Sequence, residues 1–169
     1  MQAALTYFGR GDTALAAEMV RAYEALREEY LELVPRALET LETLRARKKR
    51  LGLLNNGNAT YQRRKINRHH LAPFFDCILI EEEFGAAKPD PRIYLAALEQ
   101  FQVTPREACM IGDNVALDVG ASQQLGIVAV WFHPARHSLP EESPVHPDRI
   151  IHALPELLDL DEEETTLPN

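Results

Sequence analysis

From residue 51 onward, short apolar runs alternate with segments that carry helix-forming patterns, and this alternation restricts the fold more than any other feature. The runs lie at residues 51–54, 77–80, 108–111 and 127–132. Runs of this length and character suit buried parallel strands. Strands that alternate with helices favour a parallel sheet with helices on its faces. The sequence therefore predicts an α/β fold with a Rossmann-like, doubly wound parallel sheet flanked by helices.

Several helix ends are marked by residues with defined capping roles. Thr104–Glu107 reads as a capping box with proline at the first helical position. Asn114 can cap a helix over residues 115–125, which Gly126 would close in a left-handed conformation. The apolar residues within 150–158 suggest a closing helix.

The two ends of the chain differ from this alternating region. Apolar residues recur at spacings of three and four between residues 15 and 33, which predicts one amphipathic helix. Residues 159–169 are acidic, and we expect them to fray. We therefore divide the chain into a helical segment (1–33), an α/β core (34–158) and an acidic tail (159–169).

Composition and charge exclude several classes of partner. The chain has 169 residues, a net charge of −8 and a pI of about 5.2, which disfavours nucleic acid and anionic membranes as partners. No apolar stretch approaches a membrane span, and residues 1–8 lack the basic-then-apolar pattern of a secretion signal. Cys77 and Cys109 each lie in an apolar run and read as small core hydrophobes in a reducing compartment. These features predict a cytoplasmic protein.

Two carboxylates follow the apolar run 108–111 in the pattern GDxxxxD. Asp113 and Asp118 then lie where a strand ends and a helix begins, which is the edge at which open α/β sheets bind ligands. Mg²⁺ favours such a place because it takes a few carboxylates together with waters and phosphate oxygens. On this stretch alone, a loop aspartate and a solvated first-turn aspartate explain the pattern equally well.

Polar groups also follow two other strand ends. Asn55, Asn56 and Gly57 come directly after the run 51–54, and Lys88 precedes a Pro-Asp-Pro sequence. Taken singly, the first group reads as a turn and the lysine as a surface residue. Their order along the chain is what carries information.

In that order these motifs resemble the haloacid dehalogenase-like (HAD) superfamily. Residues 51–57 match the family's second motif, except that Asn55 stands where the family has serine or threonine. Residues 85–91 match the third motif through Lys88, and residues 112–118 match the fourth. Gly120-Ala121 and Leu125–Ile127 also follow the family pattern. The resemblance covers roughly residues 30–158.

The resemblance implies a phosphatase-type site that acts on a small phosphate monoester with Mg²⁺. Lys88 would neutralise the transferring phosphoryl group, and Asn55 and Asn56, with the backbone at Gly57, would bind its oxygens. Asp113 would hold Mg²⁺ directly. Asp118 would support the metal through water or orient Lys88.

The family's first motif, a strand followed by Asp-x-Asp-Gly-Thr, is missing from the sequence. Its first aspartate is the nucleophile, and Asp12 is a poor substitute for it. We therefore interpret residues 1–33 as the remnant of the family's helical cap. In the family's sheet order the lost strand lies between strands 51–54 and 108–111. Residues 3–8, a second copy or partner segment, or closure of the two flanking strands could fill its place.

Three functions remain open at this stage. The first is a HAD-like phosphatase whose nucleophile segment exists in the native protein. The second is a truncated or degenerate, catalytically inactive member that binds metal, a phosphorylated ligand or a protein partner. The third is a dehalogenase of the same superfamily, against which the metal-type pair Asp113 and Asp118 argues. Whether the chain is an enzyme is not decided by its residues.

Overall fold

The computed structural model describes residues 13–29, 31–135 and 143–160. The chain divides into two compact units, Met1–Leu33 and Val34–Asn169. The first unit contains helix α2 (Thr13–Glu29), as its apolar spacing predicts. The segment 3–8, Asp12 and the end of the acidic tail lie outside the described residues, and the assignment of residues 1–33 to a cap remnant stays a prediction.

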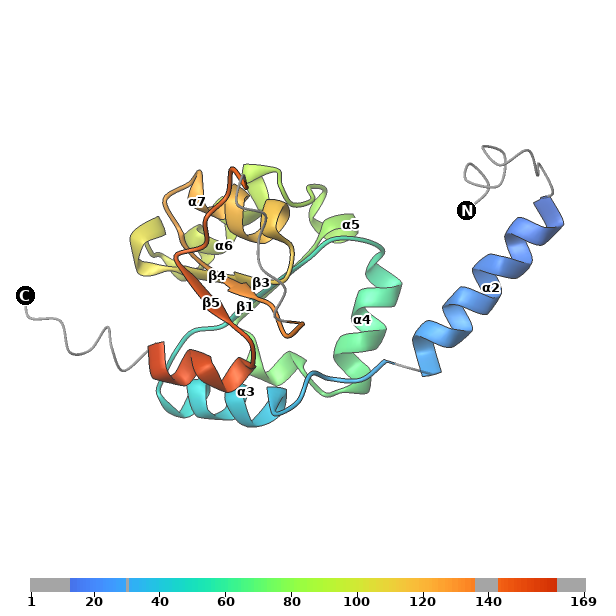
Figure 1. Cartoon of the computed structure of the whole chain (residues 1–169), viewed down its shortest axis with the longest axis horizontal. Helices are drawn as coiled ribbons and strands as arrows, with labels where there is room; N and C mark the ends of the chain where they lie inside the picture. Colours follow the sequence, from blue (N-terminus) through green and yellow to red (C-terminus); the bar gives the residue numbers. More distant parts are fainter. Residues whose placement is uncertain (1–12, 30, 136–142, 161–169) are drawn as a thin grey trace, which may run out of the picture. The chain divides into compact units, whose positions relative to one another are not determined.

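The second unit alternates strands and helices along the chain (Figure 1). Its strands are β1 (Gly52–Asn55), β2 (Cys77–Ile80), β3 (Cys109–Gly112), β4 (Val128–Phe132) and β5 (Arg149–Ile151). Its α-helices are α3 (Ala37–Ala46), α4 (Ala59–Arg68), α5 (Glu81–Phe84), α6 (Pro91–Phe101) and α7 (Ala121–Gln123). Short turns are η1 (Ala72–Phe74), η2 (Pro105–Glu107), the π-helical η3 (Val115–Gly120) and η4 (Leu154–Glu156). None of the described helices has the length and apolar character needed to cross a bilayer.

All strand pairs are parallel, and they form two separate groups. Strand β1 pairs with β2, and β3 pairs with β4, which in turn pairs with β5. Helices α6 and α7 lie on one side of the strands and α3 on the other (Figure 1). The predicted α/β fold with a parallel, helix-flanked sheet is confirmed. Within the described residues β1 and β3 do not pair, so the expected closure of these two strands on each other does not occur there.

Helix α6 holds the two strand groups in one core. Its buried side chains Ile93, Tyr94 and Leu98 share a cluster with Leu54 of β1 and Met110 of β3. This follows from the helical spacing of its apolar residues, which places them on one stripe. Asp90 caps α6 by accepting a hydrogen bond from the Arg92 N–H (2.9 Å).

The predicted caps occur, but two expectations about elements are corrected. Asn114 accepts hydrogen bonds from the backbone N–H groups of the turn that it begins, and Thr104–Glu107 forms the capping box. The helix expected over 115–125 is a π-helical turn followed by the short α7. Residues 149–151 form strand β5, so the closing helical segment begins only at Leu154. Pairing with β4 overrides the helical spacing there.

The two cysteines have different environments. Cys77 is buried in β2, as predicted, and its pKa is raised by that burial. Cys109 is exposed, so its assignment to the core is wrong. The reason is that β3 has β4 on one side only, among the described strands, which leaves its first residue uncovered.

Candidate active site

Lys88 and Asp118 form an ion pair at the carboxyl ends of the strands. Lys88 Nζ lies 2.6 Å from Asp118 Oδ1, and the two side chains are only 12% and 5% exposed. Asp118 Oδ2 accepts a hydrogen bond from the Asn114 backbone N–H (2.9 Å). Both carboxylate oxygens therefore have a partner. Because a buried charge is costly without its partner, each member of this pair depends on the other.

The turn that presents Asp118 is fixed from three sides. The Asn114 side chain accepts from the N–H groups of Ala116 and Leu117, and Ser122 Oγ donates to the Asp118 carbonyl (2.5 Å). The Tyr94 hydroxyl donates to the Leu117 carbonyl. Irregular π-helical turns are frequent at functional sites because they re-aim a side chain.

Burial raises the pKa of Tyr94 to about 12, and the negative charge of Asp118 adds to the effect. The phenol therefore stays protonated across the physiological range. Its hydroxyl remains a donor to the carbonyl of the turn.

Gly112 gives Asp118 the space that it occupies. A Cβ atom at Gly112 would lie 2.2 Å from Asp118 Oδ2, which is far closer than atoms can approach. The glycine of GDxxxxD is thus required by the position of the second aspartate.

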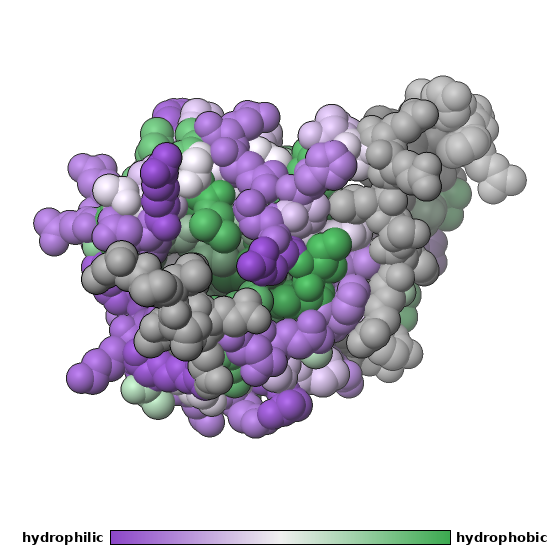
Figure 2. All heavy atoms as spheres, turned by 60° about the vertical axis from the view of Figure 1, so that its left-hand side comes forward, coloured by the Kyte–Doolittle hydropathy of each residue, from purple (hydrophilic) through white to green (hydrophobic). Residues whose placement is uncertain are grey.

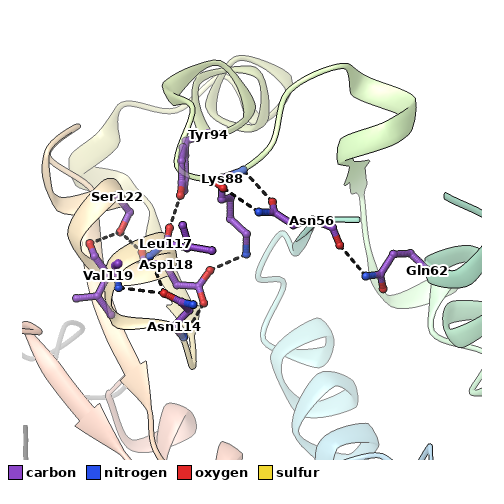
Figure 3. A network of polar contacts seen from close by, with 10 residues as sticks. Asn56, Gln62, Lys88, Tyr94, Asn114, Leu117, Asp118, Val119 and Ser122 are labelled. Carbon is purple, nitrogen blue, oxygen red and sulfur yellow. Dashed lines mark hydrogen bonds and ion pairs between the residues drawn. The ribbon is translucent and has the colours of Figure 1, made fainter. Parts of the chain in front are cut away.

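Asn56 connects β1 to Lys88. Its Nδ2 donates to the Lys88 carbonyl (2.8 Å), and its Oδ1 accepts from the Lys88 backbone N–H (2.8 Å). Gln62 of α4 donates in turn to the Asn56 carbonyl (2.8 Å) and accepts from Lys65 Nζ (3.2 Å). Figure 3 shows this series of contacts running from Gln62 through Asn56 and Lys88 to Asp118. Both polar atoms of the Asn56 side-chain amide are therefore hydrogen-bonded to the backbone of Lys88.

The other two predicted phosphate-binding residues lie at the same edge. Asn55 ends β1 and is partly exposed, and the described structure gives its side chain no hydrogen bond. The Gly57 N–H donates to Glu81 Oε2 (2.6 Å), so a carboxylate of α5 occupies that amide. Gly57 itself has a φ of 106°, a conformation that favours glycine.

Asp113 differs from Asp118 in being exposed. Its backbone carbonyl accepts a hydrogen bond from Trp131 Nε1 (3.0 Å), while its carboxylate has no hydrogen bond or ion pair among the described residues. An exposed, uncommitted carboxylate at this edge fits a direct ligand of a hard cation. No group of three or more His, Cys, Asp or Glu side chains that could hold a metal occurs within residues 13–29, 31–135 and 143–160. A cation here would therefore need phosphate or water oxygens, or ligands from elsewhere.

Several residues that shape this site are not identified by sequence motifs. Tyr94 and Ser122 lie in apolar helical patterns, where they read as core. Trp131 reads as core or rim, yet it holds the Asp113 carbonyl and stacks on His133 with ring centroids 4.1 Å apart. The sequence signal that could have found one of them is an aromatic residue with a polar N–H near the end of an apolar run, which describes Trp131.

Comparison with known proteins identifies the family. A profile of the haloacid dehalogenase-like hydrolases matches residues 2–126. The chain belongs to this family. The resemblance inferred from the strand-end motifs is confirmed.

Similar proteins of the family include phosphatases. The chain is 36% identical over 146 residues to a glyceraldehyde 3-phosphate phosphatase of Pyrococcus furiosus, covering 86% of this chain and 61% of that one. It is 39% identical over 142 residues to a phosphoserine phosphatase of Thermus thermophilus, covering 84% and 56%. A crystal structure of a HAD phosphatase from Thermococcus onnurineus superposes with a TM-score of 0.72 at 33% identity, covering 82% and 63%. The chain thus spans 56–63% of the length of these three relatives.

Proposed function

We propose that this chain forms the metal- and phosphate-binding part of a HAD phosphatase that hydrolyses a small phosphate monoester. The observation that carries the proposal is the buried Lys88–Asp118 pair beside the exposed Asp113 carboxylate, at the end of a strand. The named substrates of the relatives, glyceraldehyde 3-phosphate and phosphoserine, are small phosphorylated metabolites. We extend that substrate class, and a cytoplasmic location, to this protein as part of the proposal.

Each residue has a role that its contacts allow. The Lys88 ammonium would neutralise charge on the transferring phosphoryl group, because charge stabilisation and alignment supply most of the catalysis in phosphoryl transfer. Asp118 aims that ammonium through the 2.6 Å ion pair and would reach a metal only through water. Asn55 would donate to phosphate oxygens, while Asn56 would act mainly by fixing the Lys88 backbone. The Gly57 amide would bind phosphate only after Glu81 leaves it.

The donor set fits Mg²⁺ with Asp113 as the direct protein ligand. When bound, the ion would neutralise negative charge on the phosphoryl oxygens. Hydrolysis also needs a nucleophile. In the family an aspartate carboxylate attacks phosphorus and the bond to the leaving alcohol breaks, after which water releases phosphate and restores the carboxylate. Of the described carboxylates at this edge, Asp113 is assigned to the metal, Asp118 is paired with Lys88 and Glu81 accepts from the Gly57 N–H. We therefore expect the chain by itself to bind Mg²⁺ and a phosphate monoester but not to hydrolyse the ester.

The same observation favours a second candidate function. A truncated or degenerate member would bind Mg²⁺, a phosphorylated ligand or a protein partner through the same residues without catalysis. Recovery of turnover when the nucleophile segment is supplied would exclude this candidate.

The proposal is tested with the chain's single tryptophan. Because Trp131 Nε1 contacts the Asp113 carbonyl, we expect Mg²⁺ to change its fluorescence in a saturable titration. Asp113→Asn should weaken that binding about tenfold or more, a loss of about 1.4 kcal/mol or more. The matched control Asp159→Asn, at an exposed aspartate remote from the site in sequence, should not change it. Equal Mg²⁺ affinity of the Asp113→Asn and wild-type chains would refute the metal assignment.

A second measurement addresses turnover. The chain should release no phosphate from an aryl phosphate in the presence of Mg²⁺. Release that Asp113→Asn abolishes would show that the chain carries its own nucleophile.

A further inference from the structure

The short helix α5 directs a row of carboxylates, residues 81–83, toward the turn after β1 and the start of α4. Glu81 Oε2 accepts a hydrogen bond from the Gly57 backbone N–H at 2.6 Å. Glu83 Oε2 lies 2.6 Å from a guanidinium nitrogen of Arg63. The first and last members of the row therefore differ in their partners. Glu81 occupies a neutral amide that the proposed function assigns to phosphate, whereas Glu83 neutralises a cation of the chain.

A carboxylate and a phosphate make the same demand on a backbone amide. Each offers an anionic oxygen, and an N–H that donates to such an oxygen forms a short, charge-assisted hydrogen bond. The Gly57 amide has one hydrogen to donate, and two anions held against it would repel each other. Glu81 and a bound phosphate therefore exclude each other at this donor.

The surroundings of Glu81 give its carboxylate room to leave the amide. An open hollow of about 730 Å³ lies beside it, and the lining includes Gly57, Glu81 and Lys88. The Glu81 side chain is partly exposed, and among the described residues the bond to Gly57 is the one hydrogen bond of its carboxylate. Rotation of this side chain into the hollow would therefore break that bond and no other described one.

The general charge of the chain does not draw phosphate to this place. Hydrophilic residues dominate the surface in the view of Figure 2, but acidic residues outnumber basic ones and the net charge is −8. Long-range electrostatics therefore disfavour a doubly charged anion. Its binding depends on local donors such as the Gly57 amide and the Lys88 ammonium, so occupation of one of them acts directly on affinity.

We propose that Glu81 is a built-in competitor that determines how tightly the site holds phosphate. The inference rests on the proposed function. The Glu81 carboxylate occupies the Gly57 amide until a phosphate group displaces it into the hollow. A free carboxylate gains little at this donor, because it would replace one hydrogen bond to a carboxylate by another. A phosphate dianion would also contact Lys88 and so gains enough to displace Glu81. Glu81 thereby selects phosphate esters against carboxylate ligands.

The size of the effect follows from the fraction of molecules in which the amide is open. The apparent Kd equals the intrinsic Kd divided by that fraction. Because a carboxylate tethered to α5 has a high effective concentration at the amide, we expect the amide to be open in about a tenth of the molecules. Glu81→Ala should therefore lower the Kd for inorganic phosphate about tenfold.

The test follows the Gly57 backbone amide signal of the full, isotope-labelled chain by NMR while inorganic phosphate is added at about pH 8, where phosphate is largely a dianion. Glu81→Ala should give the tenfold lower Kd. Glu83→Ala is the matched control, because it removes the same charge from the same helix and leaves the Gly57 contact in place. Its Kd should stay within about twofold of the wild-type value. Equal gains in affinity for the two variants would show that charge and not occupation of the amide matters, and would overturn the proposal.

Glu81→Gln keeps the proposal testable if Glu81→Ala fails to fold. A neutral acceptor forms a weaker hydrogen bond than a carboxylate does, so the phosphate affinity of this variant should exceed that of the wild type. An unchanged affinity would overturn the competitor.

Acetate tests the selection against carboxylates. It should leave the Gly57 signal of the wild type unchanged and shift that of the folded Glu81 variant. Equal responses of the two proteins to acetate would contradict the selection.

The outcomes separate this inference from the proposed function. Tighter phosphate binding in Glu81→Ala, together with Mg²⁺ binding that depends on Asp113, supports both. Tighter phosphate binding without Asp113-dependent Mg²⁺ binding keeps the competitor and rejects the metal assignment. Asp113-dependent Mg²⁺ binding with equal phosphate affinities of wild type and Glu81→Ala rejects the competitor alone. A Gly57 signal that does not respond to phosphate in any variant also overturns it, because the amide is then no phosphate donor.

Discussion

At the scale of single residues, the site depends on side chains that hold other side chains in place. Asn56 is the clearest case. It fixes the backbone on which Lys88 is mounted, through one donated and one accepted hydrogen bond of 2.8 Å each. The side-chain amide does both at once because its donor and its acceptor are two separate atoms. An ionised aspartate in its place would still accept from the Lys88 N–H but could not donate to the Lys88 carbonyl.

Asn56→Ala should therefore lower the free energy of unfolding by about 1–3 kcal/mol, because it leaves partly buried backbone groups of Lys88 without partners. Urea denaturation followed by Trp131 fluorescence measures this change. Asn67→Ala on the exposed face of α4 is the control, since no hydrogen bond of its side chain is described, and should be near neutral. A near-neutral Asn56→Ala would show that Lys88 is positioned by other contacts.

Gly112 offers a second test at this scale. Gly112→Ala should displace the Asp118 carboxylate and cost about 1–3 kcal/mol, as overpacking of a filled site does. In the background of Asp118→Gly, the same substitution should cost much less, because all the Asp118 side-chain atoms that it meets, Oδ2, Cγ and Cβ, are gone. Additive effects in this double-mutant cycle, measured by urea denaturation, would place the strain elsewhere.

At the scale of elements, the π-helical turn η3 is the place where the structure differs most clearly from the helix that the sequence predicts. Asn114 as its cap and Gly112 before it follow from local chemistry, and both were predictable. The π-helical form of the turn was not, and one of the contacts that hold it is the hydrogen bond from the Tyr94 hydroxyl of α6 to the Leu117 carbonyl. Such a contact joins residues far apart in the sequence, and no local pattern encodes it.

The same distinction explains the rest of the fold and site. Strands β1 to β4 can be predicted because each is an apolar run. Asp113 and Lys88 can be predicted because they are polar groups that follow such runs. By contrast, Ile150 and Ile151 have helical spacing yet form β5, because the edge of β4 offers backbone partners that the spacing cannot reveal. The link between Gln62 and Asn56, and that between Trp131 and Asp113, likewise depend on how the chain folds back on itself.

The turn can be tested through Tyr94. Its folded pKa is about 12 against about 10 when unfolded, so the unfolded chain loses the phenolic proton first as the pH rises. The stabilisation is full below pH 10 and is lost as the pH rises to 12. The free energy of unfolding should fall over that range, and Tyr94→Phe should remove up to about 2–3 kcal/mol of the fall. Tyr23→Phe, at a tyrosine that is largely exposed, should leave the pH profile unchanged. If the free energy of unfolding of wild type and of Tyr94→Phe depended on pH in the same way, the raised pKa of Tyr94 would be contradicted.

At the scale of the whole core, the Lys88–Asp118 pair ties two strand groups that share no backbone hydrogen bonds among the described residues. Arg36 and Glu39 approach each other equally closely, at 2.6 Å, but both are largely exposed. Distance is therefore the same in the two pairs and burial differs. If burial decides what an ion pair does for stability, removing one partner should matter only in the first.

Lys88→Met should lower the free energy of unfolding by about 3–5 kcal/mol, because Asp118 is left buried without a counter-charge. Adding Asp118→Asn should recover much of that loss, since the amide oxygen still accepts from the Asn114 N–H and no charge remains. Glu39→Gln should produce no measurable change. Hydrogen exchange extends the test, since loss of the tie should let β1–β2 and β3–β4–β5 open at different free energies rather than together. Equal effects of Lys88→Met and Glu39→Gln on the free energy of unfolding would mean that α6 alone holds the two strand groups. Lys88 would then contribute to ligand binding and not to stability.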